Sequence, residues 1–211
     1  MAREARTRTA GVLALALVVV AGCSGSGGSG GAGEDPAPAA PESTADARAD
    51  LTVLPEDALP QDWRRVDPAD RIDGNPGKPR YCGLDAEPDG VVEGRVPYYE
   101  SSRLPSAILE YGMVATEASA TATLDALEAR RDDCVDPGYE VTAVPPAELG
   151  DVGDQRVAWD LVAEDDPSLR SRALVFRRGE VVVVLVATGQ TSVPTDEQEQ
   201  VAEAIDRRLR G

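Results

Sequence analysis

The sequence contains no histidine and a single lysine, Lys78, and aromatic residues make up only 4% of its 211 positions. The absence of histidine excludes Ser-His-Asp triads, Cys-His dyads, HExxH zinc sites and histidine-based pH switches. Lys78 leaves one loop candidate for Schiff-base chemistry. Eight aromatic side chains are also few for the deep cleft of a glycoside hydrolase. We therefore expect no enzyme, no catalytic residue and no cofactor.

The N-terminus has the three parts of a bacterial export signal. Three arginines lie within the first eight residues, and an apolar run follows over residues 10–20. This run is shorter than the ~20 apolar residues that span a bilayer, so it predicts a cleaved signal rather than a membrane helix. It ends in Val20-Ala21-Gly22-Cys23, which resembles the lipobox of bacterial lipoproteins. That resemblance implies removal of residues 1–22 and a diacylglycerol thioether on Cys23. The alternative is an ordinary secretory signal in which Cys23 has no role.

Residues 24–50 are almost entirely small, proline or acidic, with almost nothing that could pack a core. This composition predicts a flexible tether, so a lipidated segment over 23–50 would join the membrane to a folded domain over 51–211. The whole chain has a formal net charge of −17. Nucleic acid and anionic headgroups should be repelled, which excludes nucleic acid as a partner and leaves the acyl chains as the membrane contact. We expect a lipid-anchored protein on the extracytoplasmic side of the cell membrane.

Cys82 and Cys134 are the cysteines that remain once Cys23 is assigned to the lipid. Exported proteins meet oxidising conditions, so we expect these two to form a disulfide bond. Closing the loop of about fifty residues between them would stabilise the fold by up to about 4 kcal/mol. Two buried free thiols and a metal site are the alternatives. A metal site needs further ligands, and neither cysteine has a second Cys or a His nearby.

Hydrophobic periodicity divides residues 51–211 into strands and two helices. An apolar stripe predicts a helix over about 117–133, and a Thr195-x-x-Gln198 capping box begins a second, C-terminal helix. The segment 51–63 is an extended lead-in with Trp63 as its anchor. Strands are expected over 91–99, 107–116, 139–144, 155–163, 172–177 and 181–188. The last is apolar on both faces and should be central. The fold class is α+β: an antiparallel sheet of about five to six strands with two amphipathic helices packed on it.

Several local features occur in a recognisable order. They are Trp63 after a leucine-proline lead-in, the pair Cys82-Gly83, a helix ending in Cys134, the turn Leu149-Gly150-Asp151 and the hairpin Arg177-Arg178-Gly179. Their order over about residues 51–211 resembles the extracellular, PknH-like sensor domains of actinobacterial Ser/Thr receptor kinases and their free-standing lipoprotein relatives. The resemblance implies an antiparallel α+β domain with a cleft and disulfides that binds an envelope ligand. The chain departs from the kinase members in lacking a kinase. A lipoprotein group with a PsbP-like sheet has a similar layout.

Two acidic clusters invite comparison with calcium sites. Asp85-x-Glu87-x-Asp89-Gly90 matches the first half of an EF-hand loop, but Val96 stands where the bidentate Glu is required. Glu148, Asp151 and Asp154 alternate with glycines and suit turn chemistry. We interpret both clusters as acidic turns and predict no metal site.

Two functions fit these features. The first is a non-catalytic sensor or ligand-binding module for an envelope-associated small molecule, lipid or glycan, for which the valine-rich central strand would supply an apolar cleft. Valine runs form core more often than pocket, so a fully packed core would defeat this hypothesis. The alternative is a lipoprotein that docks an envelope protein through its acidic surface. The sequence does not identify ligand-binding residues for either function.

Overall fold

The computed structural model describes residues 44–71 and 77–211. The predicted signal peptide, Cys23 and most of the predicted tether lie outside the described residues. In the described part, eight strands form one antiparallel sheet. Two short strands, β2 (Arg80–Tyr81) and β3 (Leu84–Asp85), pair separately. This part of the chain contains no helix long and apolar enough to cross a membrane.

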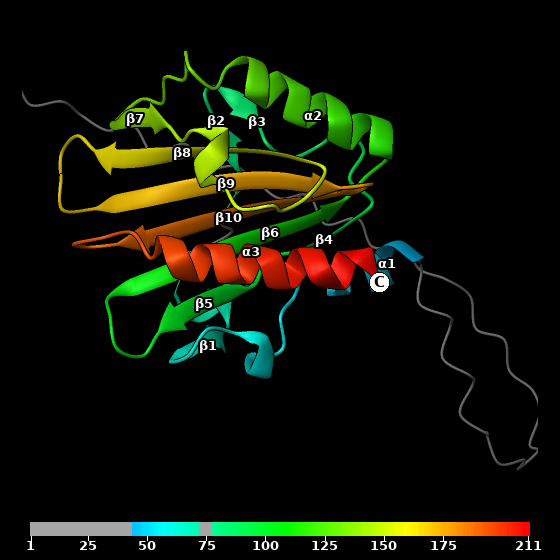
Figure 1. Cartoon of the computed structure of the whole chain (residues 1–211), viewed down its shortest axis with the longest axis horizontal. Helices are drawn as coiled ribbons and strands as arrows, with labels where there is room; N and C mark the ends of the chain where they lie inside the picture. The colour runs from blue at the N-terminus through cyan, green and yellow to red at the C-terminus, as the bar shows by residue number, and fades with distance from the viewer. Residues whose placement is uncertain (1–43, 72–76) are drawn as a thin grey trace, which may run out of the picture. The chain divides into compact units, whose positions relative to one another are not determined.

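The large sheet runs from an N-terminal edge strand to a strand in the middle of the sequence. Its order is β1 (Trp63–Val66), β5 (Tyr98–Ser101), β6 (Ser106–Val114), β10 (Val181–Gly189), β9 (Arg170–Arg178), β8 (Gln155–Ala163) and β7 (Tyr139–Ala143) (Figure 1). A further short strand, β4 (Glu93–Arg95), also pairs with β6. The sheet therefore has two to three strands more than the five to six expected. Trp63 begins an edge strand, and the strand expected over 91–99 is interrupted before Pro97, which lacks the N–H that a continuous ladder needs.

Strand β10 lies in the middle of the sheet with both faces buried, as its continuous apolar pattern predicts. Val183 points toward the helix α3 (Thr195–Arg210), and Val184 points toward the helix α2 (Glu117–Ala129). Both valines have no exposed surface. A turn of two residues, in which Gly179 takes a φ of +57°, joins β9 to β10. The fold is thus three layers, with α3 on one side of the sheet and α2 on the other.

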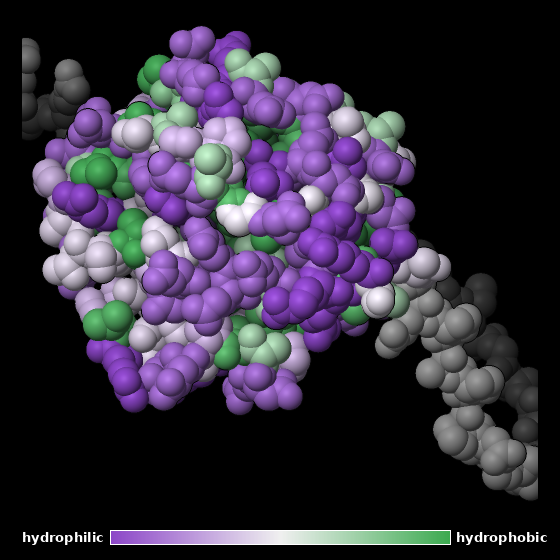
Figure 2. Space-filling view, in the orientation of Figure 1, coloured by the Kyte–Doolittle hydropathy of each residue, from purple (hydrophilic) through white to green (hydrophobic). Residues whose placement is uncertain are grey.

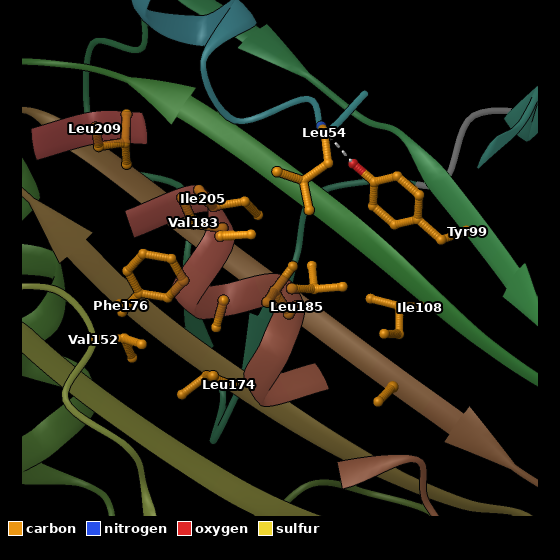
Figure 3. Close-up of a cluster of buried hydrophobic side chains, with 14 of the residues drawn as sticks. Leu54, Tyr99, Ile108, Val152, Leu174, Phe176, Val183, Leu185, Ile205 and Leu209 are labelled. Atoms are coloured by element: carbon orange, nitrogen blue, oxygen red, sulfur yellow. Dashed lines mark hydrogen bonds between the residues drawn. The ribbon is translucent and has the colours of Figure 1, made fainter. Parts of the chain in front are cut away.

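Helix α3 lies across the front of the sheet in Figure 1. The expected stripe of Val201, Ile205 and Leu209 is buried against β10 side chains such as Val183 and Leu185 (Figure 3). Hydrophilic residues cover most of the outward surface of this helix (Figure 2). Burial of one stripe beside a charged outer face is the amphipathic pattern that the sequence predicts.

The expected capping box does not start α3. Pro194 occupies the N-cap position, and no side chain there hydrogen-bonds the first turn. Gln198, only 1% exposed, points into the core and donates to the backbone oxygens of Leu185 at 2.9 Å and Arg172 at 3.0 Å. A buried amide must be paired, and strand carbonyls supply its partners here.

Helix α2 begins where expected, because the hydroxyl of Thr116 accepts a hydrogen bond of 3.2 Å from the backbone N of Ser119. It ends at Ala129, four residues earlier than the sequence predicts. The indole of Trp159 donates to the carbonyl oxygen of Arg131 at 3.1 Å, so this aromatic side chain satisfies a group just beyond the helix end. The loop that follows carries Cys134.

The last seven residues of the predicted tether are ordered as helix α1 (Thr44–Asp50). Ala49 in this helix has no exposed surface and belongs to the core on the α3 side. The segment from α1 to Leu54 is called the N-terminal strap below. The composition predicts flexibility here because alanine and acidic residues are common in tethers. A helix of this length is not stable by itself, and its packing on the sheet supplies the missing stability.

Candidate functional site

The side of the sheet that carries α2 is only partly covered by that helix. Helix α2 contacts β8, β9 and β10. The rest of this side, across β5, the N-terminal half of β6 and the C-terminal end of β10, is hollowed into an open groove of about 660 Å³. The groove is turned away from the viewer in Figure 1, because α3 covers the near side. Its volume lies in the range of small-molecule sites.

The floor of the groove consists of two rows of side chains that cross three strands. Register places Tyr98 of β5 beside Leu109 of β6, and Leu109 beside Val186 of β10. Leu109 and Val186 are partly buried against the hydrophobic core on the α2 side. Residues paired directly across a ladder point to the same face of the sheet. The first row is therefore an aromatic ring followed by two aliphatic side chains.

The second row lies two residues further along the strands and is polar at both ends. Glu100 pairs with Ala107, and Ala107 pairs with Thr188. The hydroxyl of Thr188 lies 3.1 Å from that of Ser171 on β9. Because residues two apart in a strand are separated by about 7 Å, the polar row runs beside the aliphatic row at that distance. The two rows form an amphipathic floor.

Two turns form the walls of the groove. Leu104 in the turn between β5 and β6 is 57% exposed, and Leu169 before β9 is 38% exposed. Gln190, directly after β10, is exposed at the same end. The hydroxyl of Ser101 accepts hydrogen bonds from the backbone N of Arg103 at 3.3 Å and of Leu104 at 3.2 Å, which holds one turn in place. The two exposed leucines add apolar surface at the edge of the groove.

The charged end of the groove is an ion-pair network around Glu100. Arg71 donates to Oε2 at 2.8 Å through Nε and to Oε1 at 3.0 Å through Nη2, while Nε of Arg64 donates to Oε1 at 3.0 Å. These hydrogen bonds lower the pKa of Glu100 to about 2. Burial raises the pKa of the Tyr98 phenol, so it stays neutral. The pKa values of both groups are thus shifted further from neutral pH. At neutral pH Glu100 and Tyr98 are therefore suited to binding a ligand rather than to transferring a proton.

A second unusual group, Glu110, faces the opposite side of β6. Its side chain has no exposed surface, and its Oε1 makes no hydrogen bond. Burial raises its pKa to about 8, against opposing effects of Tyr99 and Thr52. Sequence reasoning missed it, although a glutamate alternating with apolar residues inside a strand pattern is a recognisable signal. Glu110 lies behind the groove floor, beneath the N-terminal strap.

The structure joins Cys82 and Cys134 in a disulfide bond with their Cα atoms 4.6 Å apart. Tyr81, next to Cys82, stacks on Trp159 with ring centroids 5.9 Å apart. The bond therefore fixes the small β2–β3 ladder and the end of α2 against the sheet. It lies outside the groove and contributes no lining residue. Cys23, the predicted lipidation site, lies outside the described residues.

The two acidic clusters form ion pairs with nearby basic residues. Glu87 pairs with Lys78 at 2.6 Å, and Asp85 pairs with Arg80 at 2.9 Å. Asp154 accepts a hydrogen bond of 2.8 Å from the backbone N of Gly179. Over residues 44–71 and 77–211, no group of three or more His, Cys, Asp or Glu side chains is arranged to hold a metal ion.

Comparison with solved structures finds neighbours of low similarity. No family model matches the chain, and no curated protein matches it. The chain is similar to the extracellular domain of PknH from Mycobacterium tuberculosis, with a TM-score of 0.38 and 13% sequence identity. The match covers 56% of this chain and 62% of the other, which is less than two thirds of that domain.

Proposed function

We propose that this protein is a non-catalytic binding module of the cell envelope, and that its groove on the α2 side of the sheet holds a small-molecule ligand. The observation that carries the proposal is the amphipathic floor. The row Tyr98–Leu109–Val186 and the row Glu100–Ala107–Thr188 lie side by side and open to solvent, while α2 packs on β8, β9 and β10 of the same side. Concave sites that combine apolar surface with a few fixed polar groups are typical of ligand binding.

The chemistry of the groove supports binding rather than catalysis. Glu100 is held as a carboxylate by two arginines, and its pKa near 2 makes it a poor general base at neutral pH. Tyr98 holds its proton because burial raises its pKa. The chain contains no histidine that could replace either group in proton transfer.

The cysteines support an extracytoplasmic location. The Cys82–Cys134 disulfide favours an oxidising compartment, because thiols are kept reduced in the cytosol. The lipobox-like sequence before Cys23 would then anchor the chain to the outer side of the membrane, as a lipoprotein. Docking of an envelope protein on the acidic surface is the competing proposal.

Native mass spectrometry of the full-length protein, extracted from its own envelope in mild detergent, tests this function. We expect the wild type to carry an additional small-molecule mass. Ala107→Trp, which fills the centre of the groove floor, should abolish that mass. Val92→Trp, at a position 67% exposed and outside the groove, is the matched control and should retain it. Wild-type protein with no bound small molecule, together with one dominant protein partner after crosslinking in cells, would overturn the proposal in favour of docking.

A further inference from the structure

The floor of the groove suits a ligand with one apolar face and a polar edge. On the floor, Leu109 and Val186 provide a strip of aliphatic surface two side chains long, beside the half-buried ring of Tyr98. The exposed Leu104 and Leu169 add aliphatic surface only at the walls. The groove is open above this strip. An acyl chain lying there would keep one side in water and lose much of the burial that drives hydrocarbon binding. A ring whose flat face is apolar needs only one side covered.

The polar row lies where the edge of such a ring would be. Glu100 and Thr188 lie about 7 Å along their strands from Tyr98 and Val186, a distance that a ring with its hydroxyl groups can reach. The hydroxyl groups of Thr188 and Ser106 can each donate and accept a hydrogen bond. At the far end, the amide of Gln190 provides both a donor and an acceptor in one plane.

The charges of the groove compensate each other. Arg71 and Glu100 are joined by two hydrogen bonds, so the two charged residues in the groove lining sum to zero. The second partner of Glu100, Arg64, is 60% exposed and does not line the groove. Because the chain as a whole is strongly acidic, an anionic ligand would also be repelled at long range. A neutral ligand therefore fits the electrostatics.

The network around Glu100 also reduces the cost of binding. Two arginines hold the carboxylate in one orientation through four hydrogen bonds, three at Oε1 and one at Oε2, so little side-chain entropy is lost when the remaining lone pair of Oε2 accepts a hydrogen bond. Two adjacent hydroxyl groups on a sugar ring can hydrogen-bond to the fixed carboxylate of Glu100 and the guanidinium of Arg71, which lie next to each other. Tyr98 adds an aromatic face on which the C–H face of a ring can pack.

We propose that the groove binds a neutral saccharide, with one sugar ring lying flat on Tyr98, Leu109 and Val186 and its hydroxyl groups turned toward Glu100, Thr188 and Gln190. This inference rests on the proposed function, because it names the ligand class of the same groove. It excludes free fatty acids and phospholipid headgroups as the principal ligand.

The test is binding of the full-length protein, in detergent micelles, to an array of neutral and uronic-acid oligosaccharides, followed by calorimetric titration of the tightest binder. We expect at least one neutral oligosaccharide to bind. Gln190→Ala should weaken that binding at least tenfold, and because Gln190 is exposed its loss should leave the fold intact. Tyr98→Ala should weaken it similarly. Tyr139→Ala removes a 40% exposed tyrosine outside the groove and should change nothing.

Titration of decanoate and decyl phosphate separates this inference from the proposed function. Binding of either one that Ala107→Trp abolishes, with no oligosaccharide bound, would overturn the saccharide assignment and leave the groove as a ligand site. Binding of neither lipid probes nor oligosaccharides also overturns it. Oligosaccharide binding that persists in both Gln190→Ala and Tyr98→Ala would place the sugar elsewhere and contradict it as well.

Discussion

The phenol of Tyr99 donates a hydrogen bond of 3.0 Å to Oε2 of Glu110, deep in the core on the α3 side of the sheet. The phenol oxygen of Tyr99 in turn accepts a hydrogen bond of 3.2 Å from the backbone N of Leu54 (Figure 3). Glu110 thus reaches the N-terminal strap through one tyrosine. Further along the strap, Arg208 of α3 donates to the carbonyl oxygen of Leu51 at 2.8 Å. Hydrogen bonds with Tyr99 of β5 and Arg208 of α3 therefore hold the strap in place.

The burial of Glu110 predicts a pH-dependent stability. Its pKa in the folded protein is about 8, above the 4.5 of an ordinary glutamate, so the folded state keeps a proton that the unfolded state loses between those values. Its contribution is fully present below pH 4.5 and is lost as the pH rises through 8. The free energy of unfolding should fall over this range by up to about 1.4 kcal/mol per pH unit.

Urea denaturation at several pH values measures this slope. Glu110→Gln should remove it, and the variant should exceed the wild type in stability above pH 8. Tyr99, Thr52 and Arg208 are the polar groups that act on Glu110 and remain unchanged. Glu140→Gln, on the exposed edge strand β7, is the control and should keep the wild-type slope. An equal slope in Glu110→Gln would show that Glu110 is ionised in the folded protein.

Gly112 is required for the strap to approach β6. A Cβ atom added there would lie 2.0 Å from Oγ1 of Thr52, whose side chain has no exposed surface. Gly112→Ala should therefore destabilise the fold by about 1–3 kcal/mol. Gly94→Ala, in the neighbouring β4, meets only a backbone oxygen at 3.4 Å and should be milder.

A double-mutant cycle with Thr52→Gly tests whether this contact is the cause. The second substitution removes the atoms that collide, so Gly112→Ala should cost much less in the Thr52→Gly background. Additive losses in chemical denaturation would show that the cost of Gly112→Ala arises in β6 itself.

Removal of the disulfide should lower stability substantially. Cys82 and Cys134 are 52 residues apart, and a loop of that size predicts a loss of about 4 kcal/mol in the double variant Cys82→Ser/Cys134→Ser. Wild-type protein denatured in a reducing agent should match the double variant. Retention of full stability after reduction would mean that packing of Tyr81 on Trp159 holds this region without the bond.

Asp206 connects α3 to the turn after β9. It is 1% exposed and accepts hydrogen bonds from Arg178 at 2.8 and 3.0 Å and from Arg210. Burial raises its pKa, but the hydrogen bonds of Arg178 and Arg210 outweigh that effect and the pKa is lowered. Its stabilising contribution is present above about pH 3.8 and is lost as the pH falls through the folded-state pKa.

Asp206→Asn should cost about 3 kcal/mol at neutral pH, because it removes the buried carboxylate that pairs with both Arg178 and Arg210 and leaves Arg178 only the partly exposed Asp154. The matched control is Glu203→Gln, which removes an exposed ion pair of 3.7 Å with Arg207 on the same helix. That change should stay within about 0.5 kcal/mol in thermal or urea unfolding. Equal effects of the two substitutions would contradict a special role for the buried carboxylate.

Hydrophobic periodicity alone predicts an element correctly where residues close in sequence decide its structure. The alternation over residues 155–163 predicts β8 with its observed bounds, and the apolar run of β10 predicts its central position. It failed where distant contacts decide. Helix α1 is stable because Ala49 packs on the sheet, and Gln198 leaves its capping role because strand carbonyls are within reach.

The sequence by itself determined the α+β class and the amphipathic faces, because these follow from local period. It indicated the pairing of Cys82 with Cys134 only once Cys23 was set aside as the expected lipidation site. Only the tertiary structure decided that Tyr98, Leu109 and Val186 form one row and that Glu110 is enclosed by Tyr99 and the strap. Leu109 of β6 pairs with Val186 of β10 more than 70 positions later in the chain, and the register of that pairing comes from the packing of whole strands. No short-range pattern records such a register.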